Sequence, residues 1–389
     1  MRILHVIPGL TVERGGPATV LEALTRHQVR LGHTVTVLTT DQGLRYGEQP
    51  LELDRHVAVR RCTVRGPDRV AYAPGFGGAA RDLLRAADIV HLHSIFTYPI
   101  HVALHEARQA GTPAILRPCG MLHHYSLRRT SLAKSLYLGW GGGGISRAVA
   151  AWHYTSLREA AESWPAGRRR HFVLANGVEP DDFALDRSLA RRQVAARWPQ
   201  LTGCRYVLFL ARLHPKKRLE LLLQAFLSAK LEEFKLVVAG PDEAQLWEGL
   251  SQRWLSAAAD RERVVRLNTV SGDAKKELLA GASAFALASE HENFGVAVLE
   301  ALASGTPVLL SPHVDLSETV ASAGWGTTVP LEVACWTEKL RDLARQPDPR
   351  EPFVARCRNW LADNFSWRRI ASQLERHYLE LQASSASLV

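Results

Sequence analysis

Short runs of apolar residues alternate with longer stretches of helical character along most of the chain. The first part contains candidate strands at residues 3–7, 34–38, 89–93, 114–116 and 152–155. The pattern restarts after residue 200, with candidate strands at residues 206–210, 235–240, 264–267, 284–288 and 307–310. Such short and continuously apolar strands are typical of parallel sheets that helices cover on both faces.

Two successive strand–helix arrays predict an α/β protein with two doubly wound, Rossmann-like domains that face each other across a cleft. We place the N-terminal domain at residues 1–172 and the C-terminal domain at residues 173–364. Residues 365–389 are predicted to form a helix that packs back on the first domain, because one apolar stripe contains Ile370, Leu374, Tyr378 and Leu381. Ligands of such sheets bind at the carboxyl ends of the strands, so we expect the site there.

The composition is that of a soluble globular protein, with 46% hydrophobic and 22% charged residues among 389. The five cysteines are scattered and form no C-x-x-C pair, so neither a disulfide framework nor a cysteine zinc site is indicated, and a reducing cytoplasm fits best. Pro8 and Gly9 interrupt the first apolar run too early for a signal peptide. No run reaches the roughly 18 to 20 apolar residues of a spanning helix. We therefore expect a cytoplasmic protein, either free or peripheral at the inner face of the membrane.

Positive charge is concentrated in the first part of the chain. Residues 1–172 contain 22 Lys and Arg against 12 Asp and Glu, whereas the remainder contains 26 against 27. This asymmetry indicates an anionic partner, such as an anionic membrane surface, a lipid pyrophosphate or nucleic acid, and a merely solubilising surface explains it equally well. The segment 123–140 mixes cations with aromatic residues and leucine, which suits a membrane interface or an ordinary amphipathic helix. No nucleic-acid-binding motif is present, so we expect no nucleic-acid partner.

The segment 289–312 carries the most informative spacing. Glu292 and Glu300 stand eight residues apart, which places them on different faces of a helix. The spacing makes sense if Glu292 lies in a loop and the helix begins near Gly295. The amides of Asn293, Phe294 and Gly295 then form an anion site, and Glu300 can reach the hydroxyls of a ribose. The structural alternative is a capping acid at Glu292 and an exposed acid at Glu300.

A second constellation lies in residues 209–226. Arg212 directly follows an apolar strand, and Lys217 lies in the loop before the next helix. Two fixed cations at the carboxyl end of a strand suit a diphosphate and stabilise charge on a leaving phosphate. The alternative is a pair of solvated surface cations, which is the usual interpretation of a Lys-Lys-Arg run.

Taken together, these motifs resemble the retaining glycosyltransferases of family 4, which have the GT-B fold and belong to the glycogen-synthase-like superfamily. The resemblance rests on Arg212 with Lys217, on the E-x7-E motif of Glu292 and Glu300, on the loop that ends in Gly15-Gly16-Pro17, and on Ala175-Asn176-Gly177-Val178. It covers nearly the whole chain. Arg218 departs from the family pattern, because a glycine commonly follows the lysine; the arginine changes the path of the loop or adds a third phosphate cation.

The resemblance implies a role for each of these residues. Arg212 and Lys217 would bind the donor diphosphate, Glu300 the ribose, and Glu292 with the three amides the donor hexose. Gly15 and Gly16 would close over the phosphates from the other domain. Such enzymes retain the anomeric configuration, with the leaving phosphate deprotonating the acceptor, and they need no cofactor and no catalytic metal. The chain contains no Asp-x-Asp metal motif.

The acceptor side is less defined. His93 ends a candidate strand, and Arg117, Cys119, His123 and His124 follow the next one. We include His93 and His123 with Arg212, Lys217 and Glu292 as candidate catalytic residues, and a polar group on the rim of a cleft explains each histidine equally well.

The sequence therefore predicts transfer of a hexose from a UDP- or GDP-sugar to a glycan or polyprenyl-linked acceptor, in exopolysaccharide or lipopolysaccharide biosynthesis. One alternative is transfer to a small soluble acceptor, as in sucrose-phosphate or trehalose synthesis. A second is a nucleotide-sugar epimerase of the same architecture, and a third is a non-catalytic nucleic-acid binder.

Overall fold

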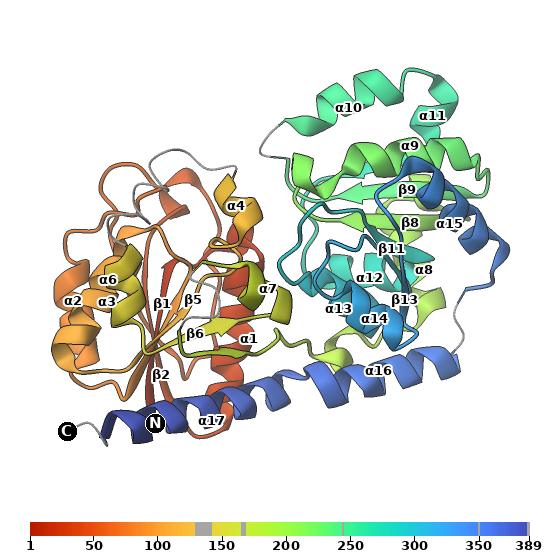
Figure 1. Ribbon diagram of the computed structural model, residues 1–389. Coiled ribbons are helices and arrows are strands. Elements are labelled where there is room, and N and C mark those ends of the chain that lie inside the picture. Colours follow the sequence, from red (N-terminus) through yellow and green to blue (C-terminus); the bar gives the residue numbers. More distant parts are fainter. Residues whose placement is uncertain (129–141, 165–168, 243–244, 349–350, 387–389) are drawn as a thin grey trace. The chain divides into compact units, whose positions relative to one another are not determined.

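The computed structural model describes residues 1–128, 142–164, 169–242, 245–348 and 351–386 (Figure 1). It divides into two compact units: unit 1 comprises Met1–Gly177 and Trp367–Val389, and unit 2 comprises Val178–Ser366. The first boundary falls five residues after the predicted residue 172, because strand β7 (His171–Val173) still pairs with strand β6 (Ala151–Tyr154) of unit 1. The predicted basic segment 123–140 lies largely outside the described residues.

Unit 1 is built on a seven-stranded parallel sheet with the order β3-β2-β1-β4-β5-β6-β7. The remaining strands are β1 (Arg2–Gly9), β2 (Thr34–Thr40), β3 (Ala58–Cys62), β4 (Ile89–His93) and β5 (Ala114–Arg117). The order reverses between β1 and β4, the central neighbours. That reversal is the topological switch point, where doubly wound sheets bind their ligands.

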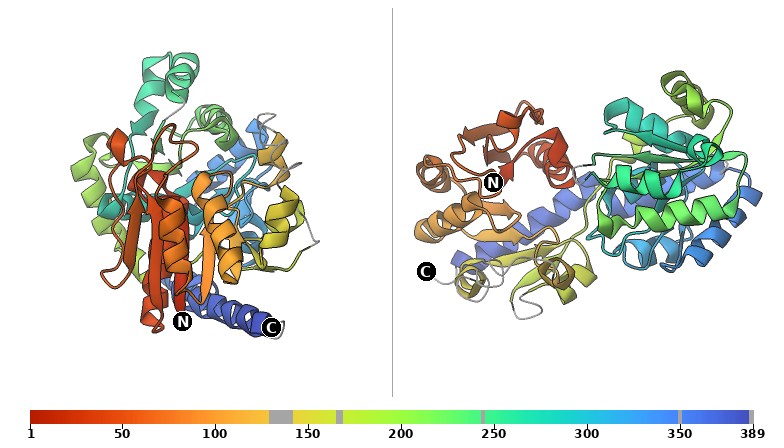
Figure 2. Two further views of the ribbon diagram at one scale, coloured as in Figure 1. Left: turned by 90° about the vertical axis from the view of Figure 1, so that its left-hand side faces the viewer. Right: turned by 90° about the horizontal axis from the view of Figure 1, so that it is seen from above.

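Helices cover both faces of this sheet (Figure 1 and Figure 2). Because side chains alternate along β1, Leu4 and Val6 share a core with α2 and α3, whereas Ile7 packs with residues of α1. The helices are α1 (Gly16–Arg30), α2 (Phe76–Leu84), α3 (Tyr98–Ala110), α4 (His124–Arg128), α6 (Gly142–Ala148), α7 (Leu157–Glu162) and α17 (Trp367–Ala386), with short 3-10 helices at Val12–Arg14 and Leu44–Tyr46.

The last helix, α17, returns to unit 1 and packs beside α1. Its predicted apolar stripe is buried, with Leu374 and Tyr378 fully inaccessible. Where the chain leaves and re-enters the unit, Gly177 contacts the ring of Trp367 so closely that a Cβ would stand 2.6 Å from it. The glycine of the Ala-Asn-Gly-Val motif is therefore required by this close approach.

Unit 2 contains a six-stranded parallel sheet with the order β10-β9-β8-β11-β12-β13. Its strands are β8 (Arg205–Leu210), β9 (Phe234–Ala239), β10 (Val264–Leu267), β11 (Ala284–Leu287), β12 (Val308–Leu310) and β13 (Gly326–Thr328). Its helices are α8 (Arg187–Arg197), α9 (Leu219–Ala229), α10 (Leu246–Trp254), α11 (Ala258–Arg263), α12 (Gly272–Gly281), α13 (Val296–Ala303), α14 (Ser317–Ser322), α15 (Val333–Arg345) and α16 (Glu351–Phe365), with 3-10 helices at Pro180–Phe183, Pro199–Leu201 and Pro215–Lys217. Here the switch point lies between β8 and β11.

The ten strands expected from apolar runs are all present, but three further strands were missed. These are β3, β7 and β13, and each lies at an edge of its sheet. An edge strand has only one neighbour and is less buried; four of the five residues of β3 are exposed. The apolar run that identifies a central strand is therefore absent from these three.

In the ranges that the structure describes, no helix combines the length and the apolar character needed to cross a bilayer.

Candidate functional site

The loops that follow β8 and β11 meet at the switch point of unit 2. The amide of Glu290 donates to the carbonyl of Lys216 over 2.7 Å, which ties the two loops together. Beside this bond, the ammonium group of Lys217 forms an ion pair with the carboxylate of Glu292. The structure thus brings together two of the predicted site residues that stand 75 positions apart in the sequence.

This corner of unit 2 carries an excess of positive charge. Burial, reinforced by Lys216 and Arg212, lowers the pKa of Lys217 to about 7, while its contact with Glu292 favours the charged form. Burial and Arg212 also lower the pKa of Lys216. The cations of Lys216, Lys217 and Arg212 thus lie close enough to repel one another, and a multiply charged anion would relieve that repulsion.

Arg218, which departs from the family pattern, keeps the backbone conformation that a glycine would adopt. Its φ of 51° and ψ of 39° are left-handed, immediately before α9 begins. Its guanidinium group donates to the carboxylate of Glu290 over 2.6 Å. The loop therefore still makes its left-handed turn, and the additional cation is held by an acid of the opposite loop.

The backbone around Glu292 is braced by the segment after β12. The backbone amide of Glu292 donates to the carbonyl of His313 over 3.0 Å, and the backbone carbonyl of Glu292 accepts from the amide of Asp315 over 3.2 Å. Gly295, at φ 87°, is the N-cap of α13, so the helix begins where the spacing predicted. Glu292 is not the helix cap, because its carboxylate pairs with Lys217. The amides of residues 293–295 directly precede the positive end of the helix dipole.

Two details refine the predicted donor residues. The side chain of Phe294 is buried against Phe365, so only its backbone is available to a ligand. Glu300 is 7% exposed and accepts from Lys275 Nζ over 2.7 Å, so it is not the exposed acid of the alternative interpretation. The carboxylate of Glu300, whose cationic partner Lys275 is partly exposed, retains lone pairs that can accept further hydrogen bonds.

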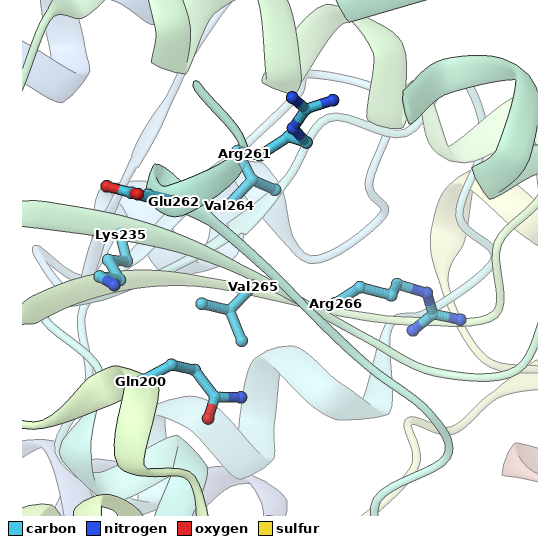
Figure 3. A pocket seen from close by; sticks show the side chains of 7 residues that line it. All are labelled: Gln200, Lys235, Arg261, Glu262, Val264, Val265 and Arg266. Atoms are coloured by element: carbon cyan, nitrogen blue, oxygen red, sulfur yellow. The ribbon is translucent and has the colours of Figure 1, made fainter. Parts of the chain in front are cut away.

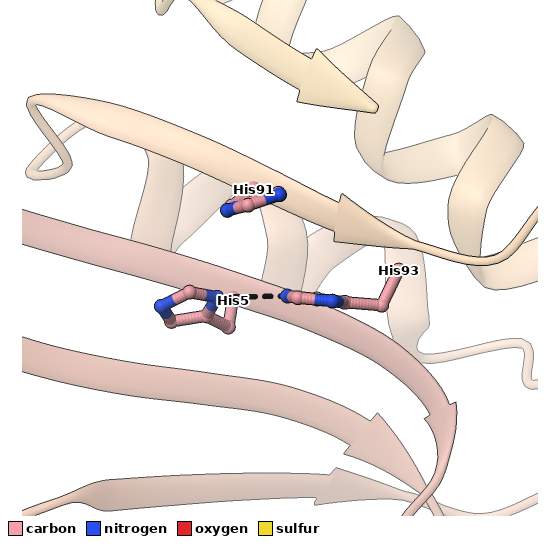
Figure 4. A group of neighbouring side chains, drawn as sticks. All are labelled: His5, His91 and His93. Carbon is pink, nitrogen blue, oxygen red and sulfur yellow. Dashed lines mark hydrogen bonds between the residues drawn. The ribbon is translucent and has the colours of Figure 1, made fainter. Parts of the chain in front are cut away.

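The switch point of unit 1 has a different chemistry. His5 of β1 and His93 of β4 share a hydrogen bond of 2.9 Å between Nδ1 and Nε2, and His91 lies beside them (Figure 4). Burial lowers the pKa of His5 to about 4 and lowers the pKa of His91, His93 and His153 well below its usual value. These four rings are therefore neutral at physiological pH, and they supply acceptors and donors beside the buried guanidinium group of Arg117, which ends the neighbouring strand β5.

Comparison with known proteins identifies the architecture. Residues 15–177 match the family model described as a glycosyl transferase 4-like domain, and residues 194–360 match that of glycosyl transferases group 1. The GDP-mannose:cellobiosyl-diphosphopolyprenol alpha-mannosyltransferase of Xanthomonas campestris is 25% identical over 97% of this chain and 96% of its own length. The chain is a GT-B glycosyltransferase of the family 4 kind.

Solved structures confirm the fold of this glycosyltransferase. HepE of Anabaena, solved in complex with UDP and glucose, superposes with a TM-score of 0.76 at 17% identity over 98% of this chain and 100% of that one. The sucrose-phosphate synthase of Thermosynechococcus elongatus superposes with a TM-score of 0.77 at 19% identity over 99% and 100%. At such identities the likeness establishes the architecture and leaves the substrates open.

The other residues that were predicted for unit 1 of the glycosyltransferase are not members of the hydrogen-bonded histidine cluster. His123 accepts from the amide of Tyr125 over 3.1 Å and contacts Glu162 over 3.0 Å, so both ring nitrogens are engaged. Arg117 is buried and donates to Asn176. Gly15, at φ 64°, caps α1, and Gly16 is its first residue. His124 is exposed at the start of α4.

Backbone strain also gathers at the carboxyl ends of the strands in this glycosyltransferase. Ser94 and Phe96, after β4, and Cys119, after β5, have φ values of 78°, 62° and 53°. Arg218 after β8 is the fourth such case, and the other non-glycine residues with positive φ in the described ranges, Ala71, Lys230 and Gln245, lie elsewhere. Non-glycine residues in this conformation are uncommon and concentrate at functional sites, which supports the placement of the site at these edges.

A shallow hollow in unit 2 lies elsewhere. It is lined by Gln200, Lys235, Arg261, Glu262, Val264, Val265 and Arg266, and Figure 3 shows that the two arginine side chains do not converge. Lys235 and Val264 stand near the amino ends of β9 and β10, away from the loops that follow β8 and β11. Arg266 is used within the protein, since it donates to the carbonyl of Gly240 over 2.7 Å. None of the predicted donor residues lines this hollow.

Several residues at the two switch points were not singled out from the sequence. Lys216, Lys275 and Glu290 take part in the ionic network of the glycosyltransferase's unit 2. His5 and Gln28 belong to the histidine cluster of unit 1. The sequence offered one signal of this cluster: His5 lies within an otherwise apolar candidate strand, and a buried polar residue needs hydrogen-bond partners.

Proposed function

We propose that the protein transfers a hexose from a nucleotide-diphosphate sugar to a glycan or lipid-linked acceptor, with retention of the anomeric configuration and without a catalytic metal. The observation that carries this proposal is the pairing of Lys217 with Glu292 beside Lys216 and Arg212, where the loops after β8 and β11 meet. A nucleoside-diphosphate sugar combines the charge and the neighbouring hydroxyls that these residues suit.

The roles follow from the contacts of unit 2. Lys217 forms an ion pair with Glu292, and a bound diphosphate would compete for the ammonium group. Glu292 would then be free to accept from a hydroxyl of the hexose, with the amides before α13 beside it. Glu300 would exchange Lys275 for the ribose hydroxyls. Arg212 and Lys217 would stabilise the charge that grows on the leaving phosphate, and this phosphate would take the acceptor's proton.

In unit 1, we assign His93 to the substrate hydroxyls. It stands at the carboxyl end of β4, at the switch point, and it is neutral. A neutral imidazole accepts a hydrogen bond from a hydroxyl without introducing a charge beside the developing oxocarbenium ion of the hexose. Gly15 and Gly16, in the loop after β1, remain the candidates for contact with the donor phosphates.

Among the donors, we propose GDP-mannose. The support is that relatives named GDP-mannose:cellobiosyl-diphosphopolyprenol alpha-mannosyltransferase match over nearly their whole length, including that of Komagataeibacter xylinus at 26% identity over 98% of this chain and 93% of its own. By the same reasoning the acceptor is a polyprenyl-diphosphate-linked glycan of an exopolysaccharide or lipopolysaccharide pathway. A lipid carrier also gives the basic excess of residues 1–172 a function at an anionic membrane surface.

A thermal-shift screen of the purified protein against GDP-mannose, UDP-glucose, GDP and UDP tests the donor, because a ligand of the native state raises the melting temperature. We expect the largest rise with the guanine nucleotides. Transfer assays should then show product with a detergent-solubilised polyprenyl-linked glycan, without loss of rate in EDTA. Product with free sugars alone would favour the soluble-acceptor alternative, and conversion of the donor without acceptor would favour an epimerase. No shift with any nucleotide would contradict the proposal.

A further inference from the structure

A chain of hydrogen bonds crosses the buried face of unit 1 and ends at His93. It links strands β1, β4 and β6 with helices α1 and α17. The bonds join His153 Nε2 to the carbonyl of Leu174 (2.9 Å), His91 Nε2 to His153 Nδ1 (3.3 Å), the Tyr378 hydroxyl to His91 Nδ1 (2.8 Å), Gln28 Nε2 to the Tyr378 hydroxyl (3.3 Å), His5 Nε2 to Gln28 Oε1 (2.7 Å) and His93 Nε2 to His5 Nδ1 (2.9 Å).

Solvent has almost no access to this chain. The six side chains range from 0% exposed for His5, His91 and Tyr378 to 3% for His153. A buried polar atom that is left unpaired costs about 1 to 3 kcal/mol, so the proton arrangement in which each donor of this chain meets an acceptor is strongly favoured. The positions of the ring protons can therefore be derived from the two ends of the chain.

The first end is the carbonyl of Leu174, which can only accept. His153 Nε2 must therefore carry the proton, and in a neutral ring Nδ1 accepts from His91 Nε2. His91 Nδ1 is then an acceptor as well, and the hydroxyl of Tyr378 donates to it. The ring of Tyr378 meets that of His91 edge-on, at 5.9 Å between centroids and 86° between planes, which places the hydroxyl at the nitrogen.

The second fixed point is the side-chain carbonyl of Gln28. His5 Nε2 must donate to it, so His5 Nδ1 accepts from His93 Nε2. The amide nitrogen of Gln28 donates to Tyr378, whose hydroxyl thus accepts once and donates once. When the four imidazoles are neutral, one arrangement satisfies all six bonds: each ring is protonated on Nε2.

This arrangement determines which nitrogen of His93 faces a ligand. Its Nε2 is committed to His5, and no group in the described part of the chain donates to its Nδ1. We propose that Tyr378 and Gln28 are positioning residues, which act through His91 and His5 to hold His93 in the Nε2–H form, with the Nδ1 lone pair directed to accept from a hydroxyl of the sugar substrate. The substrate contact rests on the proposed function, whereas the protonation pattern does not.

A metal ion is the competing occupant of this cluster. One ring nitrogen each of His5, His91 and His93 lie within 4.8 Å of one another. A metal would have to take lone pairs that His5 and His91 use in the network, and it would release Tyr378 or His93 from its bond. Bound metal and the hydrogen-bonded pattern are therefore mutually exclusive states that experiment can separate.

Long-range proton–nitrogen NMR of the full-length protein, deuterated and labelled with 15N-histidine, reads the protonation of each ring directly. We expect His5, His91, His93 and His153 in the neutral Nε2–H form at neutral pH. Tyr378→Phe keeps the ring and removes only the hydroxyl, so we expect His91 and its neighbours to lose their single form. With donor and acceptor, kcat should fall by about tenfold while KM for the donor stays within about twofold, the scale found for groups that orient a functional residue.

Tyr154→Phe is the matched control, because Tyr154 is another buried tyrosine of unit 1, and its hydroxyl has no hydrogen bond in the described residues. We expect it to change neither the NMR pattern nor kcat. Gln28→Leu interrupts the chain at a second point and should alter His5 and His93 first, which keeps the test available if Tyr378→Phe is unstable.

Three results would overturn the proposal. The first is any of the four rings in the Nδ1–H or charged form in the unaltered protein. The second is an unchanged pattern and kcat in Tyr378→Phe. The third is stoichiometric zinc in the purified protein that is lost in His5→Gln. Since the spectra need no substrate, the predicted pattern in a protein without transferase activity would contradict the proposed function and leave the network intact.

Discussion

The two units share one architecture and use its functional edge in opposite ways. Each has an all-parallel sheet whose order reverses once, and in each the notable side chains lie where the reversal occurs. In unit 2 these side chains are charged and form two ion pairs, Lys217 with Glu292 and Lys275 with Glu300. In unit 1 they are mainly neutral rings in a directed hydrogen-bond chain, with the buried Arg117 beside them. The edge of unit 2 suits an anion, whereas the histidine cluster of unit 1 suits neutral hydroxyls.

This contrast shows that the net charge of a domain says little about its site. The basic excess lies in residues 1–172, yet the ionic site lies in the other unit. The arginines of β3, Arg60 and Arg61, are exposed on an edge strand, away from the neutral cluster. Surface charge acts over the range of the Debye length, whereas a site acts through a few buried groups.

The largest expected difference between the units is in their stability at acid pH. Below about pH 6.5 the unfolded chain protonates its histidines, whereas the buried rings of His5, His91, His93 and His153 have lowered pKa values. Their contribution to stability is therefore complete above about pH 6.5 and is lost as the pH falls toward the pKa of about 4 of His5. Each such group contributes at most about 1.4 kcal/mol per pH unit in this range.

Hydrogen exchange at pH 7 and pH 5, corrected for intrinsic rates, measures this effect in peptides from β4 and from β8. We expect protection of β4 to fall first. His153→Gln should make the pH dependence shallower by about one proton, and His105→Gln, at an exposed position, should leave it unchanged. Equal loss of protection in both units would show that the buried rings do not dominate acid stability.

Lys217→Ala should have the next largest effect. It removes the buried cation that would stabilise the leaving phosphate, so turnover should fall by at least about 10²-fold, or about 2.7 kcal/mol. Steady-state kinetics at saturating donor measure it, with the melting temperature recorded for each variant. The control is Lys276→Ala, since Lys276 pairs with Asp273 on the surface of α12. Rates near those of the unaltered enzyme would remove Lys217 from the site.

Glu300→Ala should weaken donor binding by about tenfold, the scale of a hydrogen bond from a hydroxyl to a charged acceptor. Calorimetric titration with a nucleoside diphosphate measures the change. Glu277→Ala is a matched control: the side chains of Glu300 and Glu277 are 10% and 8% exposed, and each pairs with one cation, Lys275 and Arg197. If both substitutions leave the affinity unchanged, the ribose assignment fails.

Arg218→Gly should have the smallest effect. Glycine adopts the left-handed backbone at this position without strain, which offsets the loss of a half-exposed ion pair with Glu290, so the stability should change by less than about 1 kcal/mol. Thermal unfolding tests this. A fall in donor affinity beyond about tenfold would instead identify Arg218 as a third phosphate cation, because loss of one charged contact is worth about that much.

Sequence alone determined the central strands and the α/β class. Apolar runs such as β8 and β11 identify themselves because a strand buried on both faces cannot be polar, and the N-terminus of α13 follows from the glycine before its apolar run. The edge strands β3, β7 and β13 carry no such signal, because solvent replaces one neighbour.

Only the tertiary structure decided which charges pair and which rings share protons. Lys217 and Glu292 are 75 residues apart, and His91 and Tyr378 are 287 apart. Local sequence cannot specify such pairs, since they depend on the strand order that brings β8 beside β11 and on the return of α17 to β4. The physical reason is that burial gives these contacts their strength, and burial is a property of the folded chain.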